Sequence, residues 1–321
     1  MRSRIARGER RRENGWQAIR ASLWSTDYLA LGMLVLYTLL DLVFIKQVKS
    51  GFGILQINIF TIAGVIALAS WYDQTGNRIA LLFRSFYILP VGYMMYSQVH
   101  NYIPLVHPQI YDATLASWDL AIFGVYPTVW ITRFATPAVT EYFQIWYNLF
   151  QIMLVVPAVG FYAGGQMRRF RSYAMMLMLG FYLSYLLYFV MPAIGPRFQL
   201  HDFHAINTEL PGVFLTQPFR ELINAGNGIV PEMKNPYDVV NRDCMPSGHT
   251  MLSLLGILLA WRYRSRWRWF ITIGGISVMI STVYLRYHYA VDLMAGIVLA
   301  LIVFVMEPWI VRLWRRSGIQ I

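Results

Sequence analysis

Eight apolar stretches, each close to the length needed to cross a lipid bilayer, constrain the fold of this chain more than any other feature. A transmembrane helix needs about 20 largely apolar residues, and it satisfies its own backbone hydrogen bonds in lipid. Charged residues make up only 13% of the chain, against roughly 25% in soluble proteins. We therefore expect an all-α, polytopic membrane helix bundle of about eight transmembrane helices, at 27–47, 53–72, 80–99, 141–164, 171–192, 247–263, 268–285 and 289–311.

The basic residues predict how these helices are oriented. If the N-terminus lies inside, most of the 27 lysines and arginines fall on the same side of the membrane. Cytoplasmic loops carry an excess of basic residues, so we expect both termini to be cytoplasmic in a bacterial inner membrane or another cell membrane. The formal net charge of +11 is then explained by topology and anionic lipid, and no nucleic-acid partner is needed.

The single cysteine, Cys244, limits what the chain can build. It excludes an intramolecular disulfide and a zinc site made from cysteines. We interpret Cys244 as a small packing residue.

Two short motifs lie where apolar stretches begin, on the predicted extracytoplasmic side. The sequence PSGH occupies Pro246–His249, and His288 lies four positions before Asp292. Positions i and i+4 share one face of a helix, so the carboxylate and the imidazole are expected to touch. A carboxylate beside an imidazole fixes its tautomer and raises its basicity, which makes His288 a candidate nucleophile or base. His249 is then the candidate partner acid.

The helix start at the PSGH motif is also suited to bind an anion. Ser247 is a candidate N-cap, and the free N–H groups of a helix N-terminus suit a phosphate. Cations on the same side are further candidates, because a guanidinium group matches phosphate oxygens in a bidentate way. The phosphate-binding candidates are Arg197, Arg286, Ser247, Gly248 and, more weakly, Lys234.

Each of these residues also has a plain structural interpretation. The His288–Asp292 pair can be a structural contact, Ser247 an ordinary helix cap, and Arg286 an interfacial arginine that extends to water. We favour function because ionisable groups beside a bilayer are costly and tend to be functional. An H-x-x-H pattern in a loop is weak evidence for a metal. We interpret the following as surface or solvated residues: His100, His107, His201, His204 and Arg220.

These motifs resemble those of the type 2 phosphatidic acid phosphatase superfamily. Its three signatures are K-x-x-x-x-x-x-R-P, P-S-G-H and S-R-x-x-x-x-x-H-x-x-x-D. The second is intact at Pro246–His249, and the third is partial, with Ser281, His288 and Asp292 at the right spacing but Thr282 in place of the arginine. Arg286 is a candidate replacement for that arginine. The first signature is absent, and its nearest basic candidates are Arg197, Lys234 and Arg242.

Less specific sequence patterns resemble those of the inositolphosphotransferase branch, which includes inositol phosphorylceramide synthases. They are the Gly-Pro-Arg at 195–197, the Tyr-Leu and His-Tyr pairs before Asp292, and the run from Asp119 to Pro127. The resemblance covers roughly residues 110–311. It implies a six-helix phosphatase-like catalytic core in which His288 attacks phosphorus, Asp292 orients it and His249 protonates the leaving alkoxide.

The resemblance further implies a metal-independent reaction without a cofactor. The substrate is then a membrane phospholipid or lipid phosphate, and the acceptor is water, inositol or a lipid alcohol. We expect a basic cytoplasmic arm at 1–26, three transmembrane helices at 27–99, the phosphatase or phosphotransferase core at 100–311 and a basic cytoplasmic tail at 312–321. Within the core, the long connection 193–246 is typical of a functional loop, and the stretch from Trp118 to Trp130 is expected to lie along the membrane interface.

Two other function classes remain as alternatives. A serine protease would need Ser247 as its nucleophile, but the chain has no G-x-S-x-G elbow. A non-enzymatic lipid-binding protein or transporter reusing the same fold would tolerate the loss of His288. An enzyme acting on a lipid phosphate at the outer leaflet is favoured over both.

Overall fold

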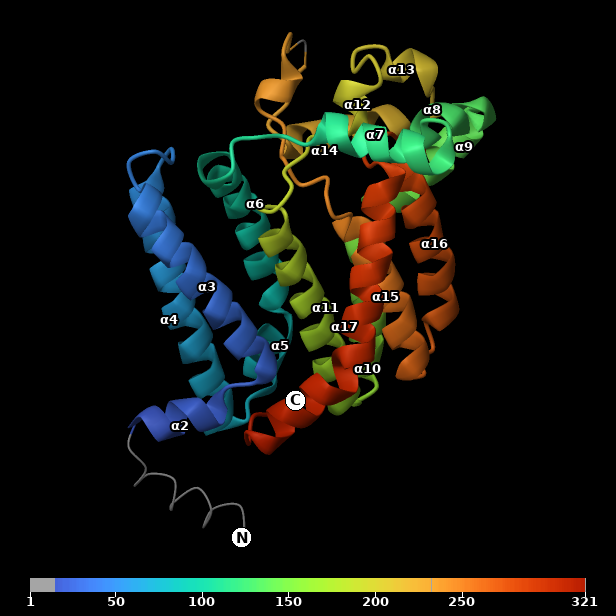
Figure 1. The fold of residues 1–321 in the computed structure, drawn as a ribbon. Coiled ribbons are helices and arrows are strands. Elements are labelled where there is room, and N and C mark those ends of the chain that lie inside the picture. Colours follow the sequence, from blue (N-terminus) through green and yellow to red (C-terminus); the bar gives the residue numbers. More distant parts are fainter. Residues whose placement is uncertain (1–14, 232, 321) are drawn as a thin grey trace. The chain divides into compact units, whose positions relative to one another are not determined.

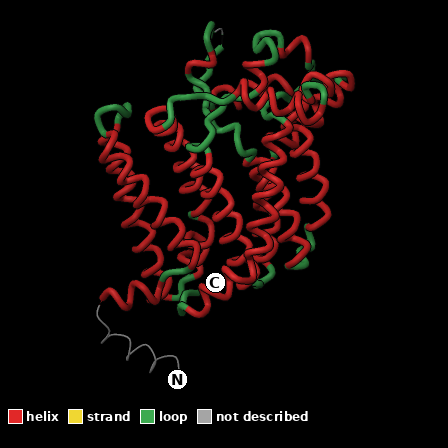
Figure 2. Tube along the Cα trace, in the orientation of Figure 1, coloured by secondary structure: helices red, strands yellow, loops and turns green. Residues whose placement is uncertain are grey.

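A computed structural model describes residues 15–231 and 233–320, so most of the arginine-rich arm lies outside the described residues. The described chain consists of helices and connecting loops without a β-strand (Figure 2). It divides into two compact units: residues up to 98 together with 307 onward, and residues 99–306.

The first unit is held together by buried polar side chains as well as by apolar packing. Its elements are α2 (Gly15–Ser22), α3 (Ser25–Phe44), α4 (Gly51–Thr75), α5 (Arg78–Phe86) and the beginning of α6 (Ile88–Val106), with the end of α17 (Ala290–Arg316). Arg84 forms an ion pair of 2.8 Å with Asp27, and both side chains are buried. The amide of Asn58 donates to Asp41 at 2.7 Å and to Gln98 at 3.0 Å. Each buried charge therefore has a polar partner, which keeps the cost of its burial low.

The second unit contains both sequence motifs. Its elements are α7 (Asp112–Phe123), α8 (Pro127–Trp130), η2 (Ile131–Phe134), α9 (Pro137–Asn148), α10 (Phe150–Ala163), α11 (Met167–Leu187), α12 (Pro196–Gln199), α13 (Ile206–Glu209), α14 (Thr216–Gly226), η3 (Pro236–Asp238), α15 (Gly248–Arg262), α16 (Arg268–Tyr284) and most of α17. Helix α15 packs against α11 and α16. The short helices α7, α8, α12, α13 and α14 gather at one end of α11, α15 and α17 (Figure 1). The described part of the long connection 193–246 thus contains three short α-helices, α12, α13 and α14.

The helix lengths confirm an all-α membrane bundle and refine the predicted spans. Among the described residues, five segments are long and apolar enough to cross a membrane: Ser25–Phe44, Gly51–Thr75, Arg78–Val106, Met167–Leu187 and Ala290–Arg316. The span predicted at 141–164 is the pair α9 and α10, bent by 52°. Helices α15 and α16 have 15 and 17 residues, shorter than the roughly 20 residues of an average span. The count of eight therefore stays a prediction.

Candidate active site

The PSGH motif forms the turn that opens α15. The Ser247 hydroxyl accepts a hydrogen bond from the N–H of Thr250 at 3.2 Å, so Ser247 is the N-cap that the sequence predicts. Its own N–H donates to the backbone carbonyl of Asp292 at 3.1 Å. A Cβ on Gly248 would lie 2.6 Å from the hydroxyl oxygen of Tyr188, closer than any real contact. Glycine therefore lets the start of α15 approach Tyr188 while it stays bonded to the first turn of α17.

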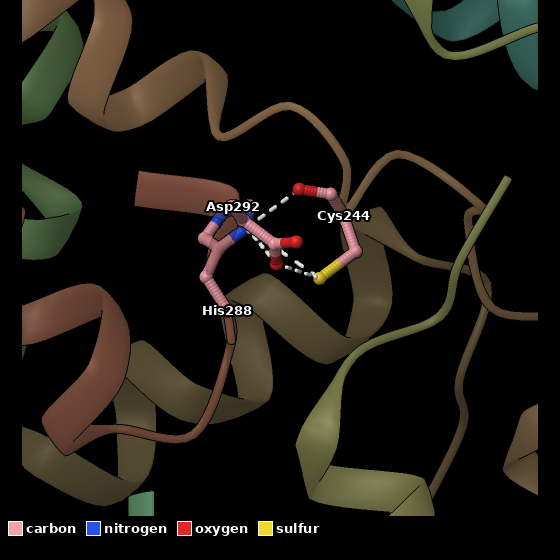
Figure 3. A group of neighbouring side chains, drawn as sticks. All are labelled: Cys244, His288 and Asp292. Carbon is pink, nitrogen blue, oxygen red and sulfur yellow. Dashed lines mark hydrogen bonds and ion pairs between the residues drawn. The ribbon is translucent and has the colours of Figure 1, made fainter. Parts of the chain in front are cut away.

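His288 lies in the turn between α16 and α17, two residues before the helix begins, so the expectation that it shares a helix face with Asp292 is wrong. The pair is nevertheless close: Nδ1 of His288 is 3.4 Å from Oδ2 of Asp292. A shorter bond joins Nδ1 to the backbone carbonyl of Cys244, at 2.8 Å (Figure 3). A carbonyl only accepts, so Nδ1 carries the proton of the neutral ring and Nε2 carries the lone pair. Within the described chain, Nε2 makes no hydrogen bond.

Cys244 bridges the two motifs, which the packing interpretation missed. Its Sγ donates to Oδ2 of Asp292 at 2.8 Å and lies 3.5 Å from Nδ1 of His288 (Figure 3). Burial raises the pKa of the Cys244 thiol well above its ordinary value, which keeps it a proton donor. The N–H of Tyr289 also donates to Oδ2 of Asp292, at 2.9 Å. The carboxylate of Asp292 is thus held by one donor from each motif region, the Cys244 thiol and the Tyr289 N–H.

His249 faces the same site from α15. The ring centroids of His249 and His288 are 5.8 Å apart. The His249 ring stacks on Tyr147 at 4.5 Å, and Tyr147 stacks on Tyr287 at 4.4 Å. The guanidinium group of Arg197 lies 5.0 Å from the Tyr287 ring centroid. The stacked residues form a continuous column, which we call the aromatic column: His249, Tyr147, Tyr287 and Arg197.

Arg197 is buried and tightly positioned. Its side chain donates to Oδ1 of Asn224 at 3.2 Å, and its N–H donates to the carbonyl of Arg286 at 3.1 Å. The turn before it needs glycine: Gly195 has φ +99°, and a Cβ there would lie 2.7 Å from the Tyr287 carbonyl oxygen. The loop after α11 is therefore fixed against the turn that carries His288.

Arg286 and Lys234 occupy different environments. Arg286 is buried and forms an ion pair with Glu209, whose side chain is 44% exposed. A phosphate that approaches Arg286 therefore competes with a carboxylate. Lys234 is exposed in the loop before η3, and its side chain is bonded to none of the motif residues in the part of the chain described. The structure brings together five of the predicted site residues: His249, His288, Asp292, Ser247 and Gly248. It connects Arg197 to them through the aromatic column.

Two carboxylates on α7 hold the segments that carry the site. Asp112 accepts the N–H groups of Ile194 at 2.9 Å and Gly195 at 2.8 Å, and Asp119 accepts those of Ala290 at 3.0 Å and Val291 at 2.9 Å. Burial raises the pKa of both carboxyl groups, and these N–H donors oppose that shift. Asp112 and Asp119 are seven residues apart, two helical turns, so they share a face of α7. That spacing is visible in the sequence, but the amides they bind are not.

Most of the residues interpreted as surface groups are instead partly or fully buried. The His100 side chain is only 11% exposed, and Nδ1 of His107 lies 2.8 Å from the carbonyl oxygen of Phe189. Arg220 is buried and donates to Asn207 and, at 3.1 Å, to the carbonyl of Leu210, so its interpretation as a solvated charge is wrong. His201 is half-buried, and its Nε2 lies 3.0 Å from the hydroxyl of Thr128. Burial lowers the pKa of His201 to about 4. His201 is therefore neutral at pH 7 and supplies no cation.

Comparison with known proteins gives the family. The family model described as the PAP2 superfamily matches residues 113–306, more than half of the chain. The chain belongs to the PAP2 superfamily. Comparison with curated proteins found no match, and comparison with solved structures found none either.

The PAP2 match spans both motifs and the turns that join them. It begins one residue into α7 and ends inside α17, so it also includes Asp119 but not Asp112. Membership supports a membrane lipid phosphatase-like enzyme that acts on phosphoric esters. The superfamily prediction is thereby confirmed, and the inositolphosphotransferase branch stays a prediction.

Proposed function

We propose that this PAP2 protein is a metal-independent lipid phosphatase or phosphotransferase whose nucleophile is Nε2 of His288. One observation carries the proposal: the Cys244 carbonyl lies 2.8 Å from Nδ1 of His288 and can only accept a hydrogen bond, so the proton stays on Nδ1 and the lone pair is on Nε2. A histidine whose tautomer is fixed in this way is ready to attack.

In the first step, Nε2 of His288 attacks phosphorus, a P–N bond forms and the P–O bond to the leaving group breaks. The leaving alkoxide takes its proton from His249, whose ring centroid lies 5.8 Å from that of His288. The imidazole gains positive charge as the phosphohistidine forms. Asp292, 3.4 Å from Nδ1, stabilises that charge.

In the second step, an acceptor hydroxyl attacks the phosphohistidine. His249 takes the proton of the acceptor, the P–N bond breaks, and His288 returns to its neutral form. Water as acceptor gives free phosphate, whereas an alcohol gives a new phosphoester. The same pair of histidines serves both outcomes, with His249 acting first as acid and then as base.

The phosphate oxygens need donors that are in place before the reaction. The N–H of Gly248 lies at the start of α15, where a helix leaves its first amides without an intrahelical partner. Ser247 directly precedes Gly248, Arg197 and Arg286 are bonded to each other through their backbones, and Lys234 is the weakest candidate of the set. Phosphoryl transfer depends mainly on positioning and charge stabilisation, which such donors supply.

Transfer of an inositol phosphate-like head group between lipids is the finer form of this proposal. The sequence patterns of the inositolphosphotransferase branch support it, and so does the long connection that folds into α12, α13 and α14 beside the site. The basic residues support an active site on the extracytoplasmic side with both termini cytoplasmic. Reporter domains fused to the C-terminus test the orientation, since a reporter active only outside the cytoplasm should stay silent.

A non-enzymatic lipid-binding or transport role is the second candidate. Buried polar groups in the first unit, such as Asp41 with Asn58, favour it because polar groups inside membrane helices often line transport paths. This role predicts that His288→Ala keeps the lipid-binding or transport activity of the protein.

The test uses purified protein in detergent with EDTA and phospholipids with labelled head groups. Free phosphate and labelled products are followed with and without inositol or diacylglycerol. His288→Ala should abolish both, and His204→Ala, a change at an exposed histidine, should abolish neither. Phosphate release that depends on His288 identifies a phosphatase, and a labelled adduct of the acceptor identifies a transferase. Activity that survives in His288→Ala, or that EDTA abolishes, would refute the proposal.

A further inference from the structure

Cys244, His288 and Asp292 place three different metal-binding atoms in one small triangle (Figure 3). Sγ of Cys244 lies 3.5 Å from Nδ1 of His288, and Nδ1 lies 3.4 Å from Oδ2 of Asp292. Sγ and Oδ2 are 2.8 Å apart. We propose that these three residues form an inhibitory site for Zn²⁺ or Cd²⁺, which rests on the proposed role of His288 as nucleophile.

The distances suit a tetrahedral ion. Zinc binds sulfur at about 2.3 Å, imidazole nitrogen at about 2.0 Å and carboxylate oxygen at about 2.1 Å, so neighbouring ligands of a tetrahedron lie roughly 3.3–3.6 Å apart. The Sγ–Nδ1 and Nδ1–Oδ2 edges already have that length. The third edge is short because the thiol donates a hydrogen bond to the carboxylate. It must lengthen by several tenths of an ångström once the ion replaces that proton.

Charge and burial also favour an ion here. All three side chains are buried, and the second carboxylate oxygen of Asp292, Oδ1, is buried without a hydrogen-bond partner in the described chain. The Cys244 thiol loses its proton to solvent as the ion binds. One thiolate and one carboxylate then balance the two positive charges of the metal, so the occupied site is neutral, which lowers the cost of burying it.

The bound ion would stop the reaction because it coordinates Nδ1 of His288 and so changes which ring nitrogen carries the proton. A neutral imidazole has one unprotonated nitrogen. A metal on Nδ1 of His288 uses that lone pair, breaks the bond to the Cys244 carbonyl and leaves the proton on Nε2. Nε2 is the atom proposed to attack phosphorus, so the metal and the nucleophilic tautomer exclude each other.

Cadmium binding measures the site without any need for activity. Tag-free protein in detergent is freed of metal and titrated with Cd²⁺, and the ultraviolet charge-transfer band of the cadmium–thiolate bond is recorded. Wild type should bind one Cd²⁺ per chain with this band. Cys244→Ser should lose the band, and Asp292→Asn should bind at least tenfold more weakly. The double variant His201→Gln, His204→Gln is the matched control and should bind like wild type.

The enzyme assay tests the inhibition separately. Zn²⁺ should lower the wild-type rate, EDTA should restore it, and Cys244→Ser should need at least tenfold more Zn²⁺ for the same fractional loss relative to its own metal-free rate. No band in wild type, or equal affinity in wild type and Asp292→Asn, would overturn the site. Stoichiometric binding with full activity would overturn the inhibition. Normal cadmium binding by a protein with no phosphoryl-transfer activity would leave the site standing and remove the proposed function instead.

Discussion

Replacing Asp292 by asparagine removes a charge beside the proposed nucleophile and changes little else. An asparagine oxygen can still accept the N–H of Tyr289, which now bonds to Oδ2 of Asp292 at 2.9 Å. What disappears is a negative charge 3.4 Å from Nδ1 of His288. With an effective dielectric constant of about 20, two full charges at that distance attract by about 5 kcal/mol.

Only part of that energy acts on the rate, because the imidazole is only partly charged in the transition state. Half of the full charge corresponds to about 2.5 kcal/mol, or roughly a 70-fold lower rate. We therefore expect kcat of Asp292→Asn to fall about 70-fold while KM changes little. An interaction that strengthens mainly in the transition state lowers kcat in this way.

The assay follows phosphate release from a lipid phosphate in detergent micelles with EDTA, over a range of substrate concentrations. Size-exclusion chromatography and thermal unfolding check that the variant is folded. Glu221→Gln is the matched control, because Glu221 is an exposed acid on α14 and should keep the wild-type rate. A folded Asp292→Asn variant within threefold of wild type, or one that changes KM alone, would refute the electrostatic role.

Three further changes test the surroundings of the site. Asp119→Asn removes one of two charge-assisted hydrogen bonds to the start of α17. The melting temperature should fall, as expected for a loss of about 1.5–3 kcal/mol of stability, and kcat should fall with it. An unchanged melting temperature and kcat would contradict a positioning role for Asp119. Glu209→Gln frees Arg286 from its ion pair and should lower KM for a lipid phosphate about fivefold, as expected for about 1 kcal/mol; an unchanged KM would remove Arg286 from the phosphate site. Burial lowers the pKa of His201 to about 4 from 6.5, so the unfolded chain binds a proton there that the folded chain does not, and stability should rise with pH between these values. His201→Gln should flatten that rise in thermal unfolding measured from pH 4 to 7, and an unaltered slope would contradict it.

The sequence was sufficient to predict the fold class and the two motifs because both depend on local patterns. Apolar length predicts membrane helices, and a serine before a glycine at the start of an apolar run predicts a cap, which Ser247 forms. The predicted span ends were less accurate where a helix bends, as between α9 and α10. No residue pattern marks that bend within an apolar run.

The contacts that fix the site could not be predicted, because they join segments far apart in the chain. The carbonyl that fixes the His288 tautomer belongs to Cys244, 44 residues earlier, and backbone groups leave no trace in a sequence. The amides that bind Asp119 lie 171 and 172 residues later. A buried carboxylate on a helix predicts a polar partner, but which partner depends on how the helices pack.

Helix α7 carries exposed apolar side chains as well as the two carboxylates that bind the site segments. Apolar side chains of Trp118, Leu120, Ile122 and Phe123 are exposed on it, while Asp112 and Asp119 hold the loop before α12 and the start of α17. We expect α7 to lie among the lipid head groups, where the binding of a helix depends on lipid composition. A shift of α7 would move the two carboxylates and, with them, the loop before α12 and the start of α17 next to His288. We therefore expect the rate of the proposed reaction to differ between bilayers of different head-group packing even at equal substrate concentration.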